Sequence, residues 1–240
     1  TKTTFDSWDS YKNNFDNGYH HQFTRNMLQL NNADGTFSEI GRLTGVSATD
    51  WSWGALIMDL DNDGRKDIFV ANGIFQDLTD QDYIQYFSNR DMVMSIVSGN
   101  NVDYKTLIDA IPSVKIPSYA FRNLGDYKFE NLAEPWGLAD PSHSNGSAYG
   151  DLDNDGDLDL VVVNLNDRPS ILRNDGGNRN HWLKLDLRLP GGKSLAIGSR
   201  MTVKVGEHVQ TQVLMPVTGY LSQCDPRPHF GLGTAEKVDS

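Results

Sequence analysis

Two acidic nonapeptides of one pattern constrain the fold of this 240-residue chain more than any other feature. The first reads Asp59-Leu-Asp-Asn-Asp-Gly-Arg-Lys-Asp67, and the second reads Asp151-Leu-Asp-Asn-Asp-Gly-Asp-Leu-Asp159. Each copy has carboxylates at positions 1, 3, 5 and 9 and a glycine at position 6. Carboxylates packed so closely repel one another unless a hard cation lies among them. The pattern therefore predicts two sites for a divalent cation that takes many oxygen ligands, Ca²⁺ above all.

The ligands follow from the way such a loop curls around an ion. Side chains at positions 1, 3 and 5 point inward, position 7 offers its backbone carbonyl, and position 9 completes the shell. Gly64 and Gly156 permit the sharp turn. The alternative is a pair of solvated acidic turns without metal. The predicted ligands are Asp59, Asp61, Asp63, the carbonyl of Arg65 and Asp67 in the first loop, and Asp151, Asp153, Asp155, the carbonyl of Asp157 and Asp159 in the second.

These loops are not EF-hands, although their first halves are similar. An EF-hand requires Glu at position 12, where this chain has Val70 and Val162. A short, β-branched apolar run follows each loop, and a further apolar run precedes it, as strands require. The repeating unit is therefore strand, calcium loop, strand.

A second repeated outline alternates with the acidic loops. Residues 25–41 contain Asp34-Gly35 between alternating apolar positions, which predicts a hairpin. Residues 121–132 repeat this outline, and Leu172-Arg-Asn-Asp-Gly-Gly begins it a third time. Internal repetition of a four-strand unit indicates a propeller blade or a β-solenoid.

Two segments interrupt the repeats. Residues 74–118 predict a helical insertion between the second and third strands of one blade, with Thr79 or Asp80 as an N-cap. A second helix is expected at about 102–111, where a proline ends it. The insertion either takes part in recognising a ligand or only covers the edge of a sheet. Residues 1–24 form an N-terminal extension that permits a short amphipathic helix or a loop.

Residues 178–240 predict a small β domain. Trp182–Leu187, Met201–Val205 and Val209–Val213 alternate between apolar and polar residues, as half-buried strands do.

The pair Trp51 and Trp53 stands just before the first calcium unit. Two such close tryptophans either pack in the core between blades or form an exposed ligand platform. Core packing is the favoured interpretation.

Composition excludes several classes of function. The net charge is −11 and the isoelectric point is about 4.8, which argues against a nucleic-acid partner. The single cysteine, Cys224, excludes an intrachain disulfide. No apolar run has the roughly 18 residues of a transmembrane segment. The chain begins with a polar stretch and has no signal peptide, so a mature or excised piece is expected.

The two Asp-x-Asp-x-Asp-Gly-x-x-Asp loops between short strands resemble FG-GAP or VCBS repeats, the calcium-binding blades of integrin α-subunit-like propellers. The C-terminal stretch resembles the ASPIC/UnbV domain, and this pairing is similar to that of the cartilage acidic protein family and of large bacterial surface proteins. The residues that carry the C-terminal match are Asn180-His-Trp-Leu, Ile197-Gly-Ser-Arg, Gly219-Tyr-Leu-Ser-Gln and His229-Phe-Gly-Leu-Gly.

The resemblance implies an all-β fold with a helical insertion: a partial β-propeller of two to three blades at residues 25–177, followed by an ASPIC/UnbV-like domain at 178–240. It implies the calcium ligands given above and no catalytic residues. Propellers close with about four to eight blades. The chain is therefore expected to be part of a longer protein, with its sheet edges covered by other subunits.

The function expected first is a calcium-stabilised, non-enzymatic binding or adhesion module that recognises a protein or a glycan. Millimolar extracellular calcium fills weak sites that cytosolic calcium leaves empty, so we expect a secreted or outer cell-surface location. No nucleophile elbow, phosphate loop or zinc-protease motif is present in the sequence. Two alternatives remain: a catalytic or accessory part of a surface glycan-processing enzyme, and a subunit or fragment of a larger surface assembly.

Overall fold

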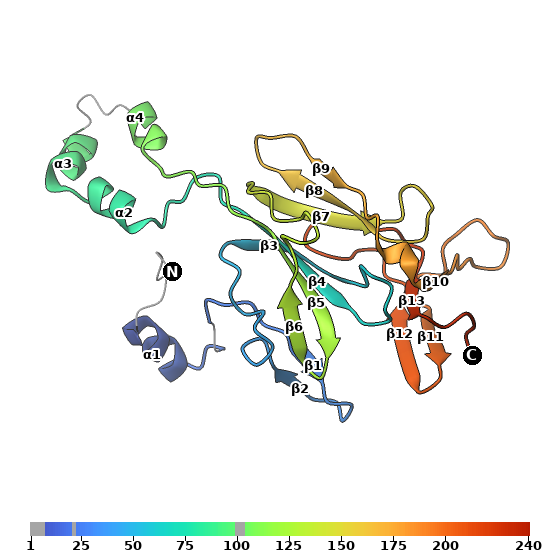
Figure 1. Ribbon diagram of the computed structural model, residues 1–240. Coiled ribbons are helices and arrows are strands. Elements are labelled where there is room, and N and C mark those ends of the chain that lie inside the picture. The colour runs from blue at the N-terminus through green and yellow to red at the C-terminus, as the bar shows by residue number, and fades with distance from the viewer. Residues whose placement is uncertain (1–7, 21–22, 99–103) are drawn as a thin grey trace.

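The computed structural model describes residues 8–20, 23–98 and 104–240. Within these ranges the chain is predominantly β, as predicted, and its strands form five sheets (Figure 1). No helix among the described residues is long and apolar enough to cross a membrane.

The first large sheet has four antiparallel strands in sequence order. They are β3 (Ser52–Met58), β4 (Asp67–Asn72), β5 (Tyr119–Gly125) and β6 (Lys128–Asn131). β4 is buried along its whole length, whereas β3 alternates between buried and exposed residues. The helical insertion lies between β4 and β5, the second and third strands of this sheet, so its predicted position is confirmed.

The second large sheet repeats the first three strands of this arrangement. β7 (Ser144–Gly150), β8 (Asp159–Asn164) and β9 (Ser170–Leu172) pair antiparallel in sequence order. The two acidic loops are therefore equivalent, because each connects the first and second strands of its sheet. In both sheets the last residue of the first strand pairs with the final aspartate of the loop: Met58 with Asp67, and Gly150 with Asp159.

The hairpin predicted around Asp34-Gly35 is confirmed as a separate sheet of β1 (Gln29–Asn31) and β2 (Phe37–Glu39). Its neighbour Leu28 packs onto one face of the four-stranded sheet, against a small cluster that contains Ile68 and Phe121.

The main core fills the space between the two large sheets. The first sheet contributes one set of fully buried apolar side chains, and the second sheet contributes the other. The largest of them are Leu56, Met58, Phe69 and Leu160. Cys224, from the C-terminal part of the chain, packs into the same cluster. The core thus connects both sheets with the C-terminal part.

The insertion forms three short helices: α2 (Gln81–Phe87), α3 (Arg90–Ser98) and α4 (Tyr104–Asp109). Asp80 is the N-cap of α2, as predicted, and its carboxylate accepts hydrogen bonds from two first-turn amides. The three helices extend away from the sheets, on the side opposite the C-terminal strands (Figure 1). The N-terminal extension contains α1 (Trp8–Asp16).

The C-terminal segment, residues 178–240, contains two two-stranded sheets. β10 (His181–Lys184) pairs with β13 (His229–Gly233), and β11 (Arg200–Val205) pairs with β12 (His208–Val213). The short helix η1 (Gly177–Arg179) precedes them. A separate apolar cluster around the fully buried Phe230 forms the core of this segment. The three predicted strands are thus present.

Trp53, predicted to pack in a core between blades, does not enter the core between the two large sheets. This side chain is 38% exposed, and its ring lies 5.9 Å from the ring of Tyr220. Trp53 occupies an outward position of β3, because the alternating positions Gly54 and Leu56 are the buried ones. Trp51 is half-buried.

Candidate metal centre

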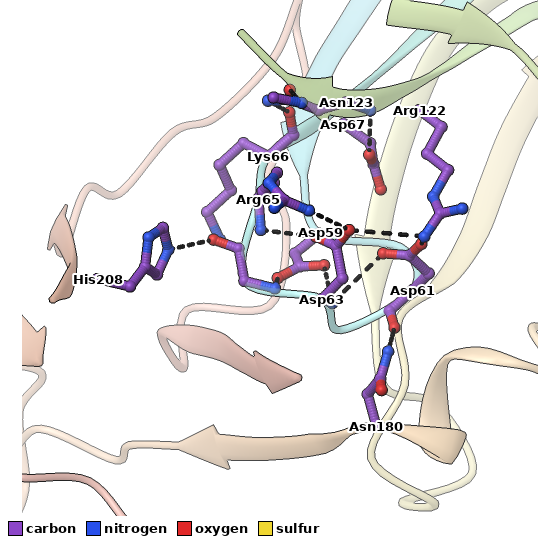
Figure 2. A network of polar contacts seen from close by, with 12 residues as sticks. Asp59, Asp61, Asp63, Arg65, Lys66, Asp67, Arg122, Asn123, Asn180 and His208 are labelled. Atoms are coloured by element: carbon purple, nitrogen blue, oxygen red, sulfur yellow. Dashed lines mark hydrogen bonds and ion pairs between the residues drawn. The ribbon is translucent and has the colours of Figure 1, made fainter. Parts of the chain in front are cut away.

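The first acidic loop brings three carboxylates together. One oxygen from each of Asp59, Asp61 and Asp67 lies within 4.8 Å of the others. Asp59 and Asp67 are fully buried, and Asp61 is half-buried. Figure 2 shows these side chains converging at the turn between β3 and β4. This loop can therefore supply several anionic oxygens to one cation.

Backbone amides fix the curl of the first loop. Asp59 Oδ2 accepts a hydrogen bond from the amide of Gly64 at 2.9 Å, and Oδ1 accepts one from the amide of Asp63 at 3.1 Å. Gly64 has a φ of 90°, and its counterpart Gly156 has a φ of 97°. This backbone conformation favours glycine, so the structural role predicted for position 6 is confirmed.

Asp63, a predicted ligand, lies outside this carboxylate cluster. Its Oδ2 is 3.2 Å from Nη1 of Arg65 and 3.5 Å from Nη2 of Arg122. The same Arg122 nitrogen lies 2.7 Å from Asp61 Oδ2, so it is shared between two loop carboxylates (Figure 2). Two arginines thus compensate part of the negative charge of the first loop.

The last aspartate of the first loop connects the loop to the next strand. Asp67 accepts hydrogen bonds from the amides of Leu60 at 3.0 Å and Asn123 at 2.9 Å. The Asn123 side chain in turn donates to the carbonyl of Lys66 at 3.0 Å.

The second loop repeats this connection. Asp159 accepts hydrogen bonds from the amides of Leu152 and Asn174, both at 2.8 Å. The Asn174 side chain donates to the carbonyls of Leu60 at 2.7 Å and Leu158 at 3.4 Å. Position 9 therefore joins each loop to the Arg-Asn pair that begins the following repeat. Asp159 does not belong to the carboxylate cluster of its loop, although Asp67 belongs to its own.

The second loop clusters Asp151, Asp153 and Asp155 within the same 4.8 Å limit. Asp151 is buried, whereas Asp153 and Asp155 are exposed. The ammonium group of Lys184, on β10, pairs with Asp151 Oδ2. The other oxygen of Asp151 is buried and has no hydrogen-bond partner among the described residues.

Asp157 differs from the prediction, which assigned only its backbone carbonyl to the metal. Its side chain is fully buried. Oδ2 accepts a hydrogen bond from the amide of Asn178 at 3.2 Å, and Oδ1 has no hydrogen-bond partner in the part of the chain that the structure describes. The equivalent residue in the first loop, Arg65, is exposed.

Burial makes Asp59, Asp67 and Asp157 hard to ionise when no cation accompanies them. Desolvation raises the pKa of Asp59 to about 7, against an opposing effect of Lys66 and with a further increase from Asp63. Desolvation also raises the pKa of Asp67 to about 7, and it raises the pKa of Asp157. A bound divalent cation reverses this effect because it stabilises the anionic form directly.

Asn62, at position 4 of the first loop, contacts both the second loop and the C-terminal part of the chain. This fully buried side chain donates to the carbonyls of Gly156 at 2.9 Å and Gly177 at 3.1 Å. Its backbone carbonyl accepts from the amide of Gly233 at 2.8 Å. A Cβ atom on Gly231 would lie 2.6 Å from Asn62 Cα, so β13 requires glycine there. One side chain thus connects the first loop, the second loop and the C-terminal segment.

Two histidines of the C-terminal segment also reach the first loop. His229 Nε2 lies 2.7 Å from Asn62 Oδ1. His208 Nε2 lies 2.8 Å from the carbonyl of Gly64, and Figure 2 shows the His208 ring pointing toward the loop. Both acceptors lack a proton, so each Nε2 carries one. Nδ1 of His229 is buried and has no hydrogen-bond partner within the described ranges, and desolvation lowers the pKa of His229 to about 4. His229 is therefore neutral at physiological pH.

The residues of both loops fit a calcium ion. The clustered donors are carboxylate oxygens, the hard ligands that Ca²⁺ prefers. In the second loop, buried oxygens of Asp151 and Asp157 have no hydrogen-bond partner among the residues that the structure describes. Buried polar atoms of this kind usually mark a ligand, an ion or a water. Each loop also forms an ion pair with a basic side chain, Arg122 with Asp61 in the first loop and Lys184 with Asp151 in the second, so each loop attracts positive charge.

Sequence reasoning missed the residues that surround the loops. Arg122, Asn123 and Asn174 belong to Arg-Asn pairs that recur in the repeats, and this recurrence could have identified them. His229 belongs to a motif of the C-terminal stretch. Asn62 also recurs, as Asn154 in the second loop, but nothing in the sequence shows that Asn62 is buried whereas Asn154 is exposed.

Comparison with known proteins agrees with this architecture. Residues 17–70 match the family model of the FG-GAP-like repeat, and residues 190–240 match that of ASPIC and UnbV. The chain thus combines these two regions, and the recognition made from the sequence motifs is confirmed. The FG-GAP-like match contains the whole first acidic loop.

Among curated proteins the chain is similar to cartilage acidic protein 1. The protein of Xenopus tropicalis is 26% identical, and the human protein is 25% identical. Each alignment covers 88% of this chain and 36% of the relative. The chain therefore spans about 36% of the length of the curated relatives that it matches.

Proposed function

We propose that this chain is a calcium-stabilised, non-enzymatic binding or adhesion module of a secreted or cell-surface protein, with a protein or a glycan as its ligand. The observation that carries the proposal is the convergence of three carboxylates in each of the two loops. In addition, buried oxygens of Asp151 and Asp157 have no hydrogen-bond partner among the described residues. FG-GAP-like repeats are typically non-catalytic, which supports a binding role.

Calcium would act first on stability. The ten predicted ligand positions lie where the two large sheets meet the C-terminal segment, so ions there would connect three parts of the fold. A ligand that binds only the folded chain stabilises it by about 2.7 kcal/mol at 100 times its Kd. Weak sites of this kind fill at extracellular calcium concentrations, which is the physical reason for placing the module outside the cell.

We propose that the two large sheets are adjacent propeller blades, with the β1–β2 hairpin as the outer half of a preceding one. Their outward faces expose apolar side chains. On β3, Trp53 and Ile57 are 38% and 57% exposed; at the far side, Val163 and Ile171 are 53% and 69% exposed. Further blades or another subunit would cover these faces, which supports the view that this chain works within a larger surface assembly.

Calcium removal tests the proposal. If two sites are filled, excess EGTA should lower the melting temperature of the 240-residue chain by roughly 15 °C. Two bound ions contribute about 5 kcal/mol to the free energy of unfolding. Each kcal/mol shifts the melting temperature of a chain of this size by about 2–4 °C. Calorimetric titration of the calcium-free chain should give two binding events.

Single-site variants identify the loops responsible. Asp61→Ala and Asp155→Ala should each abolish one of the two binding events. Asp109→Ala, at an exposed acid of α4 paired with Lys105, should leave both events intact. An unchanged melting curve in EGTA would show that the acidic loops are solvated turns and that the calcium role is wrong.

A further inference from the structure

A cleft between the two large sheets opens at the end of the strands opposite the acidic loops. It has a volume of about 190 Å³. β7 and β8 meet the second acidic loop at Gly150 and Asp159, whereas Ser144 and Asn164, at their other ends, line the cleft. None of the predicted calcium ligands lines it. We call it the serine pocket, after the four serines among its lining residues: Ser118, Ser142, Ser144 and Ser170.

The base of the serine pocket is apolar and rigid. Phe69 and Val162, buried core residues of the two sheets, contribute to it together with Leu172. The loop that forms one wall is held on both sides by backbone hydrogen bonds. Ile116 and Ser142 exchange two, at 3.0 and 3.1 Å, and the amide of Leu165 donates to the carbonyl of His143 at 2.8 Å. The pocket is therefore formed before any ligand arrives.

A directed chain of hydrogen bonds lines the polar wall. Asn164 Nδ2 donates to Ser170 Oγ at 3.0 Å and to the carbonyl of Arg168 at 2.8 Å, which uses both amide hydrogens. Asn164 Oδ1 accepts from Ser144 Oγ at 2.9 Å, so Ser142 must donate to Ser144 across 2.6 Å. The hydroxyl hydrogen of Ser170 has no acceptor in the described part of the chain, and the oxygen of Ser142 keeps free lone pairs.

The rim of the pocket carries balanced charge. Asp167 Oδ2 pairs with Lys115 Nζ at 2.9 Å. Asp140 and Arg168 also line the rim, and neither side chain has a hydrogen bond or a salt bridge within the ranges that the structure describes. Two acids and two bases give no net charge, in contrast to the strongly acidic chain. The rim thus offers one donor group and one acceptor group to a neutral ligand.

We propose that the serine pocket binds one neutral sugar ring of a glycan. An apolar base suits the C–H face of such a ring, while a few placed hydroxyl, amide and charged groups suit its hydroxyls. Pockets for drug-sized ligands measure about 300–1,000 Å³, so this smaller cleft restricts the ligand to a single ring. The inference rests on the proposed binding function and specifies the glycan among its possible ligands.

Sugar titration followed by NMR tests the pocket. The ¹⁵N-labelled 240-residue chain in calcium buffer is titrated with the methyl glycosides of glucose, galactose, mannose and N-acetylglucosamine. At least one should shift the amide signals of Ser142, Asn164 and Ser170 saturably, with a Kd of about 1–10 mM, as weak single-ring binding requires. L-Serine serves as a zwitterionic probe of the same size class.

Variants of single pocket residues, compared with a control variant outside the pocket, test which side chains bind the sugar. Ser170→Ala removes the free hydroxyl donor and should weaken binding about fivefold, the effect of one lost hydrogen bond. Arg168→Met should weaken it similarly. Ser38→Ala, at an exposed serine of the β1–β2 hairpin, should leave the Kd unchanged. The same spectra report whether each variant is folded.

Three results would overturn the proposal: no saturable shift with any sugar at about 50 mM, shifts elsewhere on the chain, or a Kd that Ser170→Ala leaves unchanged. Saturation by L-serine alone would also overturn it, in favour of an amino-acid site. The calcium experiment is independent. If EGTA destabilises the chain but no sugar shifts its signals, only the sugar-binding proposal is contradicted. If a sugar shifts the signals but EGTA does not destabilise the chain, only the proposed role of calcium is contradicted.

Discussion

The two acidic loops share a sequence pattern and a place in their sheets, yet their surroundings differ. In the first loop Asp59, Asn62 and Asp67 are fully buried, and the C-terminal segment lies against Asp59 and Asn62. In the second loop the residues at positions 3 to 5 are exposed, and the buried charge lies at its two ends and at position 7. The same nonapeptide thus produces a covered site and an open one.

This difference shows that burial, rather than the ligand pattern, separates the roles of the loops. The first loop is the place where both sheets and the C-terminal segment meet, through Asn62 and His229. The second loop keeps Asp153 and Asp155 accessible to solvent and already holds Lys184 against Asp151. We therefore expect the first loop to govern stability, and the second loop to exchange its ion more readily.

Position 4 gives the largest and most direct test. Asn62 and Asn154 both have positive φ, 55° and 60°, so alanine strains the backbone equally at each. Asn62→Ala also removes three buried hydrogen bonds and should cost roughly 3–5 kcal/mol, whereas Asn154→Ala should cost about 1 kcal/mol. Urea unfolding with saturating calcium measures both. Equal costs would show that Asn62 does not join the three parts of the fold.

The second test uses pH and the buried His229. Its pKa in the folded chain is about 4, below the ordinary value of 6.5. The unfolded chain therefore binds a proton first as the pH falls. The contribution of neutral His229 to stability is complete above about pH 6.5 and is lost between pH 6.5 and 4, a loss of about 3 kcal/mol.

The variant His229→Gln should accordingly lose less stability than the unmodified chain when the pH falls from 7 to 4.5. His181→Gln, at an exposed histidine of the neighbouring β10, should keep the full pH dependence. Thermal melts across this range make the comparison. Identical slopes for the two variants would place the proton uptake on other groups.

The smallest expected effect concerns the arginines that begin the following repeats. Arg122 pairs with Asp61 and Asp63, whereas Arg173 pairs with the nearby Asp175 at 2.8 Å. Arg122→Met should tighten calcium binding at the first loop about two- to fivefold, because it removes a partly solvated positive charge beside the carboxylates.

Arg173→Met should change calcium binding at the second loop by less than this. Calorimetry with the other loop disabled, by Asp153→Ala or Asp61→Ala, isolates each site. Weaker binding after Arg122→Met would mean that the arginine orients Asp61 for the ion instead of competing with it.

Local patterns predicted the elements because each pattern has a local cause. Asp34-Gly35 fixed the hairpin through turn chemistry, Asp80 began a helix through capping, and Gly64 allowed the turn of the first loop. The face of β3 that carries Trp53 could not be predicted, because alternation defines two faces of a strand but does not say which face a neighbouring sheet covers.

The sequence by itself determined that this chain is an all-β protein with two equivalent acidic loops, an interrupting helical insertion and a distinct C-terminal segment. Spacing within a few residues sets these features. Only the tertiary structure decided that one loop is buried and the other open, that Asn62 joins three parts of the chain, and that four serines meet in one pocket. Those outcomes depend on contacts between residues far apart in the sequence, which no local pattern encodes.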